Sequence, residues 1–379
     1  MSNVLIIPVD FYPNSTGFAN ASLNLVEAVK KYNPEINIYV YADVLLKEGQ
    51  QEIEGVKVYR NTRYRVNAFY RRYKELCDII DNNNIDFVLF ETNTFYILQN
   101  LLANRYPNKV AVRIHSTADT ETMVFRKPSL KGRFLRYTAK KFMKQCNTVL
   151  CTNSYHQKFI YKYFYDDNVY TMWDRSHFIL PNTVPPVLPV DENREEPYIF
   201  ALGKLSYDGY IQKGISDLLS ACFILKQRGI DVPLEIVGDG NYYDKIAGLV
   251  SRFGLSKVRL IKSLKHDEVI EHVNNSCAVI LVSRYEGQSM FATEAIASAK
   301  PVIFTNDNGM SDLIKDGING YVVKTGDCLD IAEKIELILK QSREKLLSMG
   351  LNSKDIYDKH YSPEAVSNIF SSIIEFSIK

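Results

Sequence analysis

The second half of the chain contains the stretch Ser283-Arg284-Tyr285-Glu286-Gly287-Gln288-Ser289-Met290-Phe291-Ala292-Thr293-Glu294-Ala295. It follows the apolar run Val279–Val282, passes through a turn that contains glycine, and continues into a run of helical periodicity. This order predicts a buried strand, a turn, and a helix that begins near Ser289. A buried strand followed by a helix is the repeating unit of an α/β fold with a parallel sheet.

The same alternation extends in both directions along the chain. In the first half we expect strands at Val4–Val9, Ile36–Ala42, Phe87–Phe90, Val110–Ile114, Thr148–Cys151 and His177–Leu180. Helices are expected after several of them, at Ala21–Tyr32 and Tyr155–Phe164. Further strands are expected at Tyr198–Leu202, Leu234–Val237, Val258–Ile261, Pro301–Phe304 and Gly320–Val323. The helices between them are expected at Ile215–Arg228, Asn241–Phe253, His266–Asn275, Met290–Ser298 and Cys328–Gln341. The pattern predicts two Rossmann-like domains.

A proline-rich stretch separates the two series. Five prolines and a run of charged residues lie between Pro181 and Pro197, where they disfavour regular structure. We therefore expect an N-terminal domain of residues 1–184, a linker of residues 185–197 and a C-terminal domain of residues 198–361. Ligands of such sheets bind at the carboxyl ends of the strands, so we expect the domains to face each other across a cleft.

Composition and charge narrow the class of protein. With 46% hydrophobic and 24% charged residues, the 379-residue chain is typical of globular proteins. Residues 1–185 hold 24 Lys and Arg against 17 Asp and Glu, a net charge of +7, and the remainder holds 22 against 27, a net charge of −5. This asymmetry predicts an anionic or membrane-like partner for the first half.

Cysteine spacing and the N-terminus indicate where the protein works. The six cysteines show no close spacing typical of disulfide frameworks or zinc sites, so we expect free thiols. The start of the chain shows no signal peptide, and no apolar run is long enough to span a bilayer. We expect a cytoplasmic protein that lies peripherally at the inner face of the membrane.

The turn before Ser289 carries the candidate chemistry. The N-terminus of a helix offers unpaired N–H groups to an anion, and Gly287 allows its backbone to approach a ligand closely. Glu286 precedes that helix and Glu294 lies within it, so a diphosphate there would have a carboxylate on either side, each suited to hydroxyl groups. A strand, a turn and a helix with solvated glutamates explain the same residues equally well.

Two other turns carry glycine and cations. Gly203-Lys204-Leu205 and Lys213-Gly214 lie between a strand and a helix, where both lysines suit phosphates. Solvated lysines on a surface loop are the commoner outcome. Gly238 follows another strand and suits a close ligand, although a plain turn is the favoured interpretation.

In order and spacing, these segments resemble the retaining glycosyltransferases of family 4 (GT4, glycosyl transferases group 1), which have the two-Rossmann-domain architecture called GT-B. The resemblance covers essentially the whole chain and is densest over residues 198–327. Its most specific mark is a pair of glutamates with seven residues between them, here Glu286 and Glu294. Lys300-Pro301-Val302-Ile303 and Gly317-Ile318-Asn319-Gly320 also match.

The resemblance implies a role for each matching residue of the second half. Glu286 would contact hydroxyls of the donor sugar, and Glu294 would hold the ribose. Lys213 would bind the diphosphate, and Lys204 stands where the family usually has arginine. The distal phosphate would lie on Gly287 and on the backbone N–H groups of Gln288, Ser289 and Met290. Gly203 and Gly238 would line the donor-binding site, and the nucleobase would lie against Lys262, Ser263 and Leu264.

The resemblance also assigns residues in the first half. His115 matches a histidine near the reacting sugar, whereas a lone histidine at a strand end is otherwise more often structural. Gly17 would approach the donor phosphate or the acceptor. Asn182 resembles an asparagine at the edge of the domain. A final helix at residues 362–379, introduced by Tyr361-Ser362-Pro363, would pack back on the N-terminal domain.

The implied reaction is a retaining transfer from a nucleotide-sugar, with a UDP-sugar favoured, to a saccharide acceptor. The departing phosphate would take the acceptor proton, so the enzyme mainly positions groups and stabilises charge. No cofactor or metal is expected, and no Asp-x-Asp motif is present to hold one.

The acceptor is suggested by a basic, aromatic segment. Residues 123–144 contain eight Lys and Arg, no acid and several aromatic residues, and residues 59–74 add more. Such a helix suits an anionic membrane surface and hence a lipid-linked acceptor. An apolar core face with solvated charges opposite is the equal alternative, and single-stranded nucleic acid is disfavoured.

Two rival functions remain open at this stage. One is a catalytically silent sugar-nucleotide-binding partner of a glycosyltransferase complex. The other is a nucleotide-sugar epimerase or phosphorylase of the same architecture. A Rossmann dehydrogenase is disfavoured because no GxGxxG follows the first strand.

Overall fold

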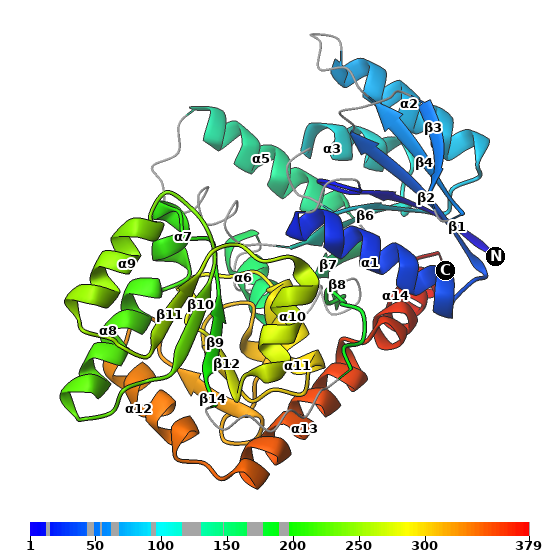
Figure 1. The fold of residues 1–379 in the computed structure, drawn as a ribbon. Helices are drawn as coiled ribbons and strands as arrows, with labels where there is room; N and C mark the ends of the chain where they lie inside the picture. The colour runs from blue at the N-terminus through cyan, green and yellow to red at the C-terminus, as the bar shows by residue number, and fades with distance from the viewer. Residues whose placement is uncertain are drawn as a thin grey trace. The chain divides into compact units, whose positions relative to one another are not determined.

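The computed structural model describes residues 1–12, 16–43, 49–53, 55–61, 68–91, 96–115, 130–146, 148–164, 177–188 and 197–378. The chain divides into two compact units (Figure 1). Unit 1 comprises Met1–Thr183 and Pro363–Lys379, and unit 2 comprises Val184–Ser362. Each unit contains a sheet of mainly parallel strands with helices on both faces, which confirms the predicted class of two Rossmann-like α/β domains.

Unit 1 is built on an eight-stranded sheet. Its strands are β1 (Ser2–Ile7), β2 (Ile36–Asp43), β3 (Gly49–Ile53), β4 (Val56–Asn61), β5 (Phe87–Phe90), β6 (Val110–Ile114), β7 (Thr148–Cys151) and β8 (His177–Ile179). They lie in the order β3-β4-β2-β1-β5-β6-β7-β8. All neighbours are parallel except β3, which pairs antiparallel with β4.

Alternation along β1 divides the core of unit 1 into two layers. Leu5 and Ile7 face the layer that includes α2 (Ala68–Asn82), α3 (Tyr96–Arg105) and α5 (Leu130–Gln145). Val4 and Ile6 face α1 (Gly17–Tyr32) and the C-terminal helix α14 (Pro363–Ile378). The remaining helix, α6 (Ser154–Phe164), follows β7.

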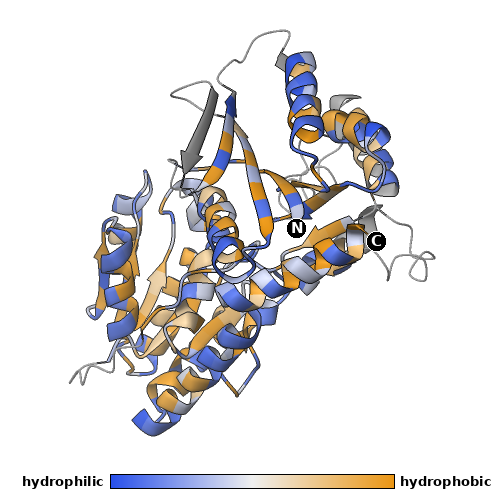
Figure 2. Ribbon diagram, turned by 90° about the vertical axis from the view of Figure 1, so that its right-hand side faces the viewer, coloured by the Kyte–Doolittle hydropathy of each residue, from blue (hydrophilic) through white to orange (hydrophobic). Residues whose placement is uncertain are grey.

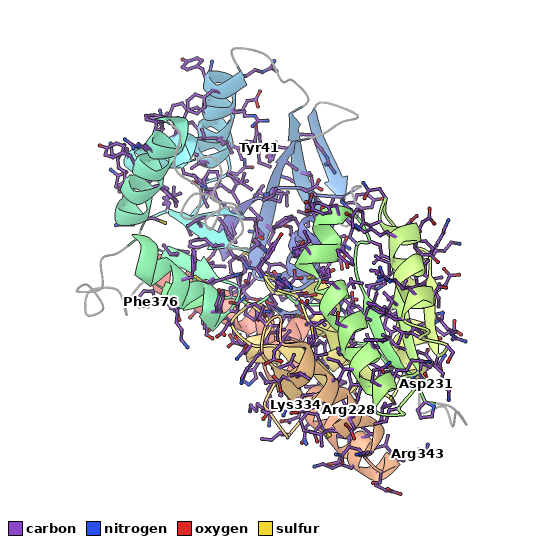
Figure 3. All side chains as sticks on the ribbon, turned by 90° about the vertical axis from the view of Figure 1, so that its left-hand side faces the viewer. Tyr41, Arg228, Asp231, Lys334, Arg343 and Phe376 are labelled. Carbon is purple, nitrogen blue, oxygen red and sulfur yellow. The ribbon has the colours of Figure 1, made fainter. Side chains whose placement is uncertain are left out.

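The C-terminal helix α14 is part of unit 1. Phe370 meets Phe87 edge-to-face with ring centroids 6.2 Å apart, and the Asn33 amide donates to the Ser367 hydroxyl at 2.6 Å. The Phe376 ring, labelled in Figure 3, packs on Phe178 with centroids 5.2 Å apart. The last segment of the chain therefore completes the core of the first domain.

Unit 2 is built on a six-stranded parallel sheet. Its strands are β9 (Ile199–Leu202), β10 (Leu234–Val237), β11 (Val258–Ile261), β12 (Ala278–Leu281), β13 (Val302–Thr305) and β14 (Gly320–Val323). They lie in the order β11-β10-β9-β12-β13-β14. The helices are α7 (Tyr207–Gln212), α8 (Ile215–Gln227), α9 (Tyr243–Arg252), α10 (His266–Asn275), α11 (Met290–Ala297), α12 (Cys328–Leu339) and α13 (Arg343–His360).

Strand order fixes where each sheet can bind a ligand. In unit 1 the order reverses between β1 and β5, and in unit 2 it reverses between β9 and β12. Where the connections that follow two neighbouring strands run in opposite directions, a crevice opens at the carboxyl ends of those strands. The loops that follow β9 and β12 contain Gly203 and Glu286, and the residue that follows β5 is Glu91.

The opposite end of unit 2 is a charged surface. Asp231 precedes β10, and it accepts a hydrogen bond from Lys226 at 3.2 Å. Figure 3 labels four charged residues toward this end of unit 2, namely Arg228, Asp231, Lys334 and Arg343.

Figure 2 shows apolar strands between helices that are polar on one side, as expected for helices that cover a sheet. No helix within the described ranges is long and apolar enough to cross a bilayer.

Several elements differ from the sequence expectations. Residues 207–212 form the helix α7 rather than a loop, and the Ser206 hydroxyl caps this helix by accepting from the Gly209 N–H at 3.2 Å. Strands β3 and β4 and helices α2, α3 and α13 were not expected. In β4, buried Val56 and Val58 alternate with exposed Lys57, so no continuous apolar run marks it. In the linker, residues 185–188 and 197 are irregular, and residues 189–196 lie outside the described ranges.

Candidate functional site

The N-terminus of α11 is held by the polar residues that precede it. Ser289 caps the helix, because its hydroxyl accepts from the Ala292 N–H at 3.3 Å. The Gln288 side chain points inward and donates to the Thr293 hydroxyl at 3.1 Å. The Gln288 side chain therefore supports the first turn of the helix.

Lys213 and Glu286 are brought together beside this helix. The Lys213 ammonium donates to the Glu286 carboxylate, and the Ser283 hydroxyl donates to the same carboxylate at 3.4 Å. Both charged side chains are largely buried, with 19% and 14% of their surface exposed. A cation and a carboxylate thus lie at the crevice between β9 and β12, within reach of one ligand.

The glycine at Gly203 makes room for that lysine. A Cβ atom at this position would lie 3.1 Å from Cγ of Lys213. The nearby Gly214 has φ +63°, and a Cβ there would lie 2.2 Å from the carbonyl oxygen of Val282. These two glycines hold the β9 loop against the end of β12, which fixes where Lys213 emerges.

The loop that carries Glu286 is held in place by hydrogen bonds to neighbouring elements. The Arg284 guanidinium donates to both oxygens of the Asp217 carboxylate in α8, at 2.9 and 2.8 Å. The Ser283 carbonyl accepts from Thr305 at 2.7 Å and from Asn308 at 3.2 Å. Helix α8 and strand β13 therefore hold both ends of the turn that leads into Glu286.

Glu294 lies in the second turn of α11. Its side chain is 14% exposed, and burial raises its pKa to about 7. Nε2 of His266, at the start of α10, lies 3.8 Å from its carboxylate. This carboxyl group is poised between its neutral and charged forms near neutral pH.

The other predicted residues of unit 2 lie around this core. Lys204 is exposed, and Gly238 is required by the fold, because a Cβ there would lie 1.9 Å from the Gly203 carbonyl oxygen. The loop after β11 contains exposed Lys262 and Ser263 and half-buried Leu264. The Lys262 ammonium lies 5.4 Å from the centroid of the Tyr243 ring. No group of three His, Cys, Asp or Glu side chains in the described part of the chain is arranged to hold a metal ion.

In unit 1, His115 is held by a buried ionic network. His115 Nε2 bonds the Glu91 carboxylate, which also accepts from Arg113 at 3.2 Å. Arg113 is fully buried and donates to the Pro181 carbonyl and the Asn182 side chain, at 2.7 and 2.8 Å. Asn182, which the resemblance places at the edge of the domain, thus helps to anchor this network.

The network sets the charges around His115. Burial would raise the pKa of Glu91, but the charge of Arg113 and the hydrogen bonds that Glu91 accepts from His115 and Arg113 outweigh it and lower that pKa to about 2. Burial lowers the pKa of His115 although Glu91 opposes this effect. His115 is therefore a neutral imidazole beside an ionised carboxylate.

Gly17 begins α1 on the other side of the unit 1 crevice. Thr16 caps that helix by accepting from the Ala19 N–H at 3.2 Å, and its hydroxyl donates to Asp10 at 2.7 Å. A Cβ atom on Gly17 would meet nothing within 4 Å among the described residues. The fold does not require glycine here, so the open space is consistent with the predicted approach of a ligand.

The chain matches the family described as Glycosyl transferases group 1 over residues 189–355. The chain carries a glycosyltransferase group 1 domain. This domain spans the crevice that contains Lys213, Glu286 and Glu294. An uncharacterized glycosyltransferase of Methanocaldococcus jannaschii is 27% identical over 368 residues, which are 95% of this chain and 94% of that protein.

Solved structures establish the architecture around the group 1 domain. The sucrose-phosphate synthase of Thermosynechococcus elongatus aligns with a TM-score of 0.77 at 15% identity, over 99% of this chain and 98% of that one. The Anabaena protein HepE in complex with UDP aligns with a TM-score of 0.73 at 15% identity, over 99% and 100%. The fold is therefore GT-B, as the sequence resemblance implied.

The charged residues of these networks that were not predicted from the sequence include Glu91, Arg113, Asp217 and His266. Glu91 had a usable signal, because it is a carboxylate that directly follows the apolar strand β5. Asp217 and His266 lie in the first turns of helices, where polar residues are common and therefore uninformative.

Proposed function

We propose that this protein is a retaining GT4 glycosyltransferase that moves a sugar from a UDP-sugar to a saccharide acceptor. The observation that carries the proposal is the contact between Lys213 and Glu286 beside the capped N-terminus of α11. On donor binding, Lys213 would exchange this partner for the diphosphate, and Glu286 would turn to hydroxyls of the sugar. The group 1 domain and the UDP in the HepE structure support this reading.

The residues present fit a leaving diphosphate without a metal ion. Lys213 supplies a positive charge, and the N–H groups of Ser289 and Met290 add the positive end of the α11 dipole. Developing charge on the leaving group is thus stabilised by fixed donors. Glu294, one turn further along, suits the ribose hydroxyls, and the loop at residues 262–264 suits the nucleobase.

The direct test is a transfer assay with UDP-sugars in EDTA, on saccharide acceptors and on lipid-linked ones. We expect free UDP and an elongated acceptor, with the anomeric configuration of the donor retained in the NMR spectrum of the product. An inverted product contradicts the retaining mechanism. Release of a free epimer with no elongated acceptor favours the epimerase, and loss of activity in EDTA contradicts metal independence.

We further propose that α5 brings the enzyme to an anionic membrane surface on the cytoplasmic side, where a lipid-linked acceptor lies. Ala139 and Phe142 are buried in the core, while Phe134 and Tyr137 are 54% and 66% exposed. Exposed Lys141 lies one turn beyond Tyr137. Residues 123–129 of the basic segment lie outside the described ranges.

Replacing Phe134 and Tyr137 by serine is expected to weaken binding to vesicles that contain anionic lipid by about tenfold or more, because two large apolar surfaces leave the interface. Co-sedimentation with anionic and with neutral vesicles measures this. Leu351→Ser, which removes an exposed leucine in unit 2, is the matched control. Equal binding of the double variant and the wild type to anionic vesicles contradicts the proposal.

A further inference from the structure

Glu294 is a largely buried carboxylate that accepts no hydrogen bond from the residues that the structure describes. Its side chain is 14% exposed, and burial is the cause that raises its pKa. Buried polar groups in native proteins are nearly always hydrogen-bonded, because an unsatisfied one costs free energy. The missing partner of this carboxylate is therefore one that a ligand or a water molecule supplies.

His266 lies beside this carboxylate. Its Nε2 is 3.8 Å from a carboxylate oxygen of Glu294, which is longer than an N–H···O hydrogen bond of about 2.7–3.2 Å. The His266 side chain is 64% exposed, so a ligand that enters from solvent can reach its ring. Within the described ranges, no hydrogen bond engages this ring. The two groups are thus close neighbours that do not satisfy each other.

Packing and capping hold the two helices that carry these side chains. Val269 of α10 and Ala295 of α11 are buried in the same hydrophobic cluster. The start of α10 is capped, since the Lys265 main-chain N–H donates to the Glu268 carboxylate at 2.7 Å. His266 is the first residue of this helix. The backbone that carries its ring is therefore held in place beside α11.

The gap of 3.8 Å between the two atoms has the size for one bridging hydroxyl group. An oxygen atom about 2.8 Å from both of them would subtend an angle of about 85°. At this angle a hydroxyl can donate its proton to the carboxylate while its oxygen accepts from an imidazole N–H. An ionised phosphate or carboxylate has no proton to donate and is repelled by Glu294. The pair therefore suits a hydroxyl.

We propose that His266 is a second ribose-binding residue of the donor site, which holds one ribose hydroxyl jointly with Glu294. A carboxylate has two oxygens, so Glu294 can accept from both hydroxyls of a vicinal diol, whereas His266 reaches only the hydroxyl beside it. The choice of ribose rests on the proposed function. The shared position for one hydroxyl rests on the distance of 3.8 Å and on the burial of the carboxylate.

The shared hydroxyl makes a specific prediction about nucleotides that lack it. Removing the hydroxyl and removing the imidazole break the same hydrogen bond, so the two losses in affinity should not add. For a hydroxyl that His266 does not contact, the two losses should be independent. The site would thereby distinguish the two positions of the diol.

Isothermal titration calorimetry of the full chain at pH 8, above the raised pKa of Glu294 of about 7, tests this prediction. The probes are UDP, 2′-deoxy-UDP and 3′-deoxy-UDP. We expect His266→Ala to weaken the binding of UDP by about tenfold. One of the two deoxynucleotides should bind this variant within about twofold of its wild-type affinity, and the other should be weakened as UDP is.

Two further variants give the matched comparison. His266→Gln places an amide N–H near the position of Nε2 and should bind UDP within about threefold of the wild type. His266→Asn places its amide near Nδ1, short of the hydroxyl, and should bind UDP as weakly as His266→Ala. Because His266 is exposed, all three variants are expected to fold, which melting curves check. Glu271→Gln, which changes an exposed side chain further along α10, is the control and should bind UDP as the wild type does.

The proposal is overturned if His266→Ala binds UDP within about threefold of the wild type, or if it weakens UDP and both deoxynucleotides equally. It is also overturned if His266→Gln binds UDP no more tightly than His266→Asn. In each of these cases the wild type still binds UDP, so the proposed donor site stands and only the role of His266 fails. If the wild type binds none of the three nucleotides, the proposed function fails and the role of His266 fails with it.

Discussion

Replacing Glu286 by glutamine is expected to lower the rate of sugar transfer by about a hundredfold to a thousandfold, with the Kd of the donor changed less than about tenfold. Glutamine has the same shape, so the crevice beside Lys213 is preserved. The lost negative charge is the one that would lie against the sugar as positive charge develops on it. After Lys213 has turned to the diphosphate, the Ser283 hydroxyl would still hold the Glu286 carboxylate, so the charge is in place against the sugar before the transition state forms.

The measurement is a comparison of single-turnover transfer rates and of donor affinities for the two proteins. Glu333→Gln, which changes an exposed glutamate of α12, is the matched control and should transfer sugar at the wild-type rate. A Glu286→Gln enzyme that retains more than a tenth of the wild-type rate would remove Glu286 from the reacting site.

Replacing Glu294 by glutamine is expected to change how stability depends on pH. In the folded protein the pKa of Glu294 is raised from 4.5 to about 7 by burial, whereas in the unfolded chain it is ordinary. The stabilisation from binding the proton is full below about pH 4.5 and is lost as pH rises to about 7. Across this range the free energy of unfolding of the wild type should fall by about 3 kcal/mol relative to Glu294→Gln.

Urea unfolding of both proteins between pH 4.5 and 8 measures this difference, since all other titrating groups are shared. Above about pH 7 the difference between the two free energies should stay constant. A difference that is independent of pH from 4.5 to 8 would mean that Glu294 is solvated, and would contradict its burial against α10.

Much of the group 1 domain could be predicted because its signals are local. Buried parallel strands such as β12 are short apolar runs, and the turns that follow them carry the glycines and charged residues of the site. The strand ends can therefore be located from spacing alone, whereas Glu286, Gly203 and Lys213 are assigned through the resemblance to the GT4 family. The contact between Lys213 and Glu286 cannot be located from spacing, because 73 residues separate them and only the order of β9 and β12 brings them together.

The parts that were missed depend on distant contacts or on burial. Glu91 acquires its role from His115 and Arg113, which lie 24 and 22 residues away. Gly238 is a glycine because of the Gly203 carbonyl, which no local pattern reveals. Helix α13 exposes most of its residues, so its apolar periodicity is weak. For Glu91 and Gly238, a tertiary contact gives the residue its role.

A thermal-shift comparison in EDTA tests whether unit 2 binds a UDP-sugar at the proposed donor site. UDP-glucose, UDP-galactose and UDP-N-acetylglucosamine are each compared with UDP on the wild type, on Glu294→Ala and on the control Glu333→Ala. A ligand that binds only the folded state raises the melting temperature, and at a concentration of about 100 Kd it contributes about 2.7 kcal/mol. We predict that one UDP-sugar stabilises the wild type and the control by several degrees and that Glu294→Ala loses this response. No shift of the wild type by any of these ligands at millimolar concentration would contradict the account and would also count against a silent sugar-nucleotide-binding partner.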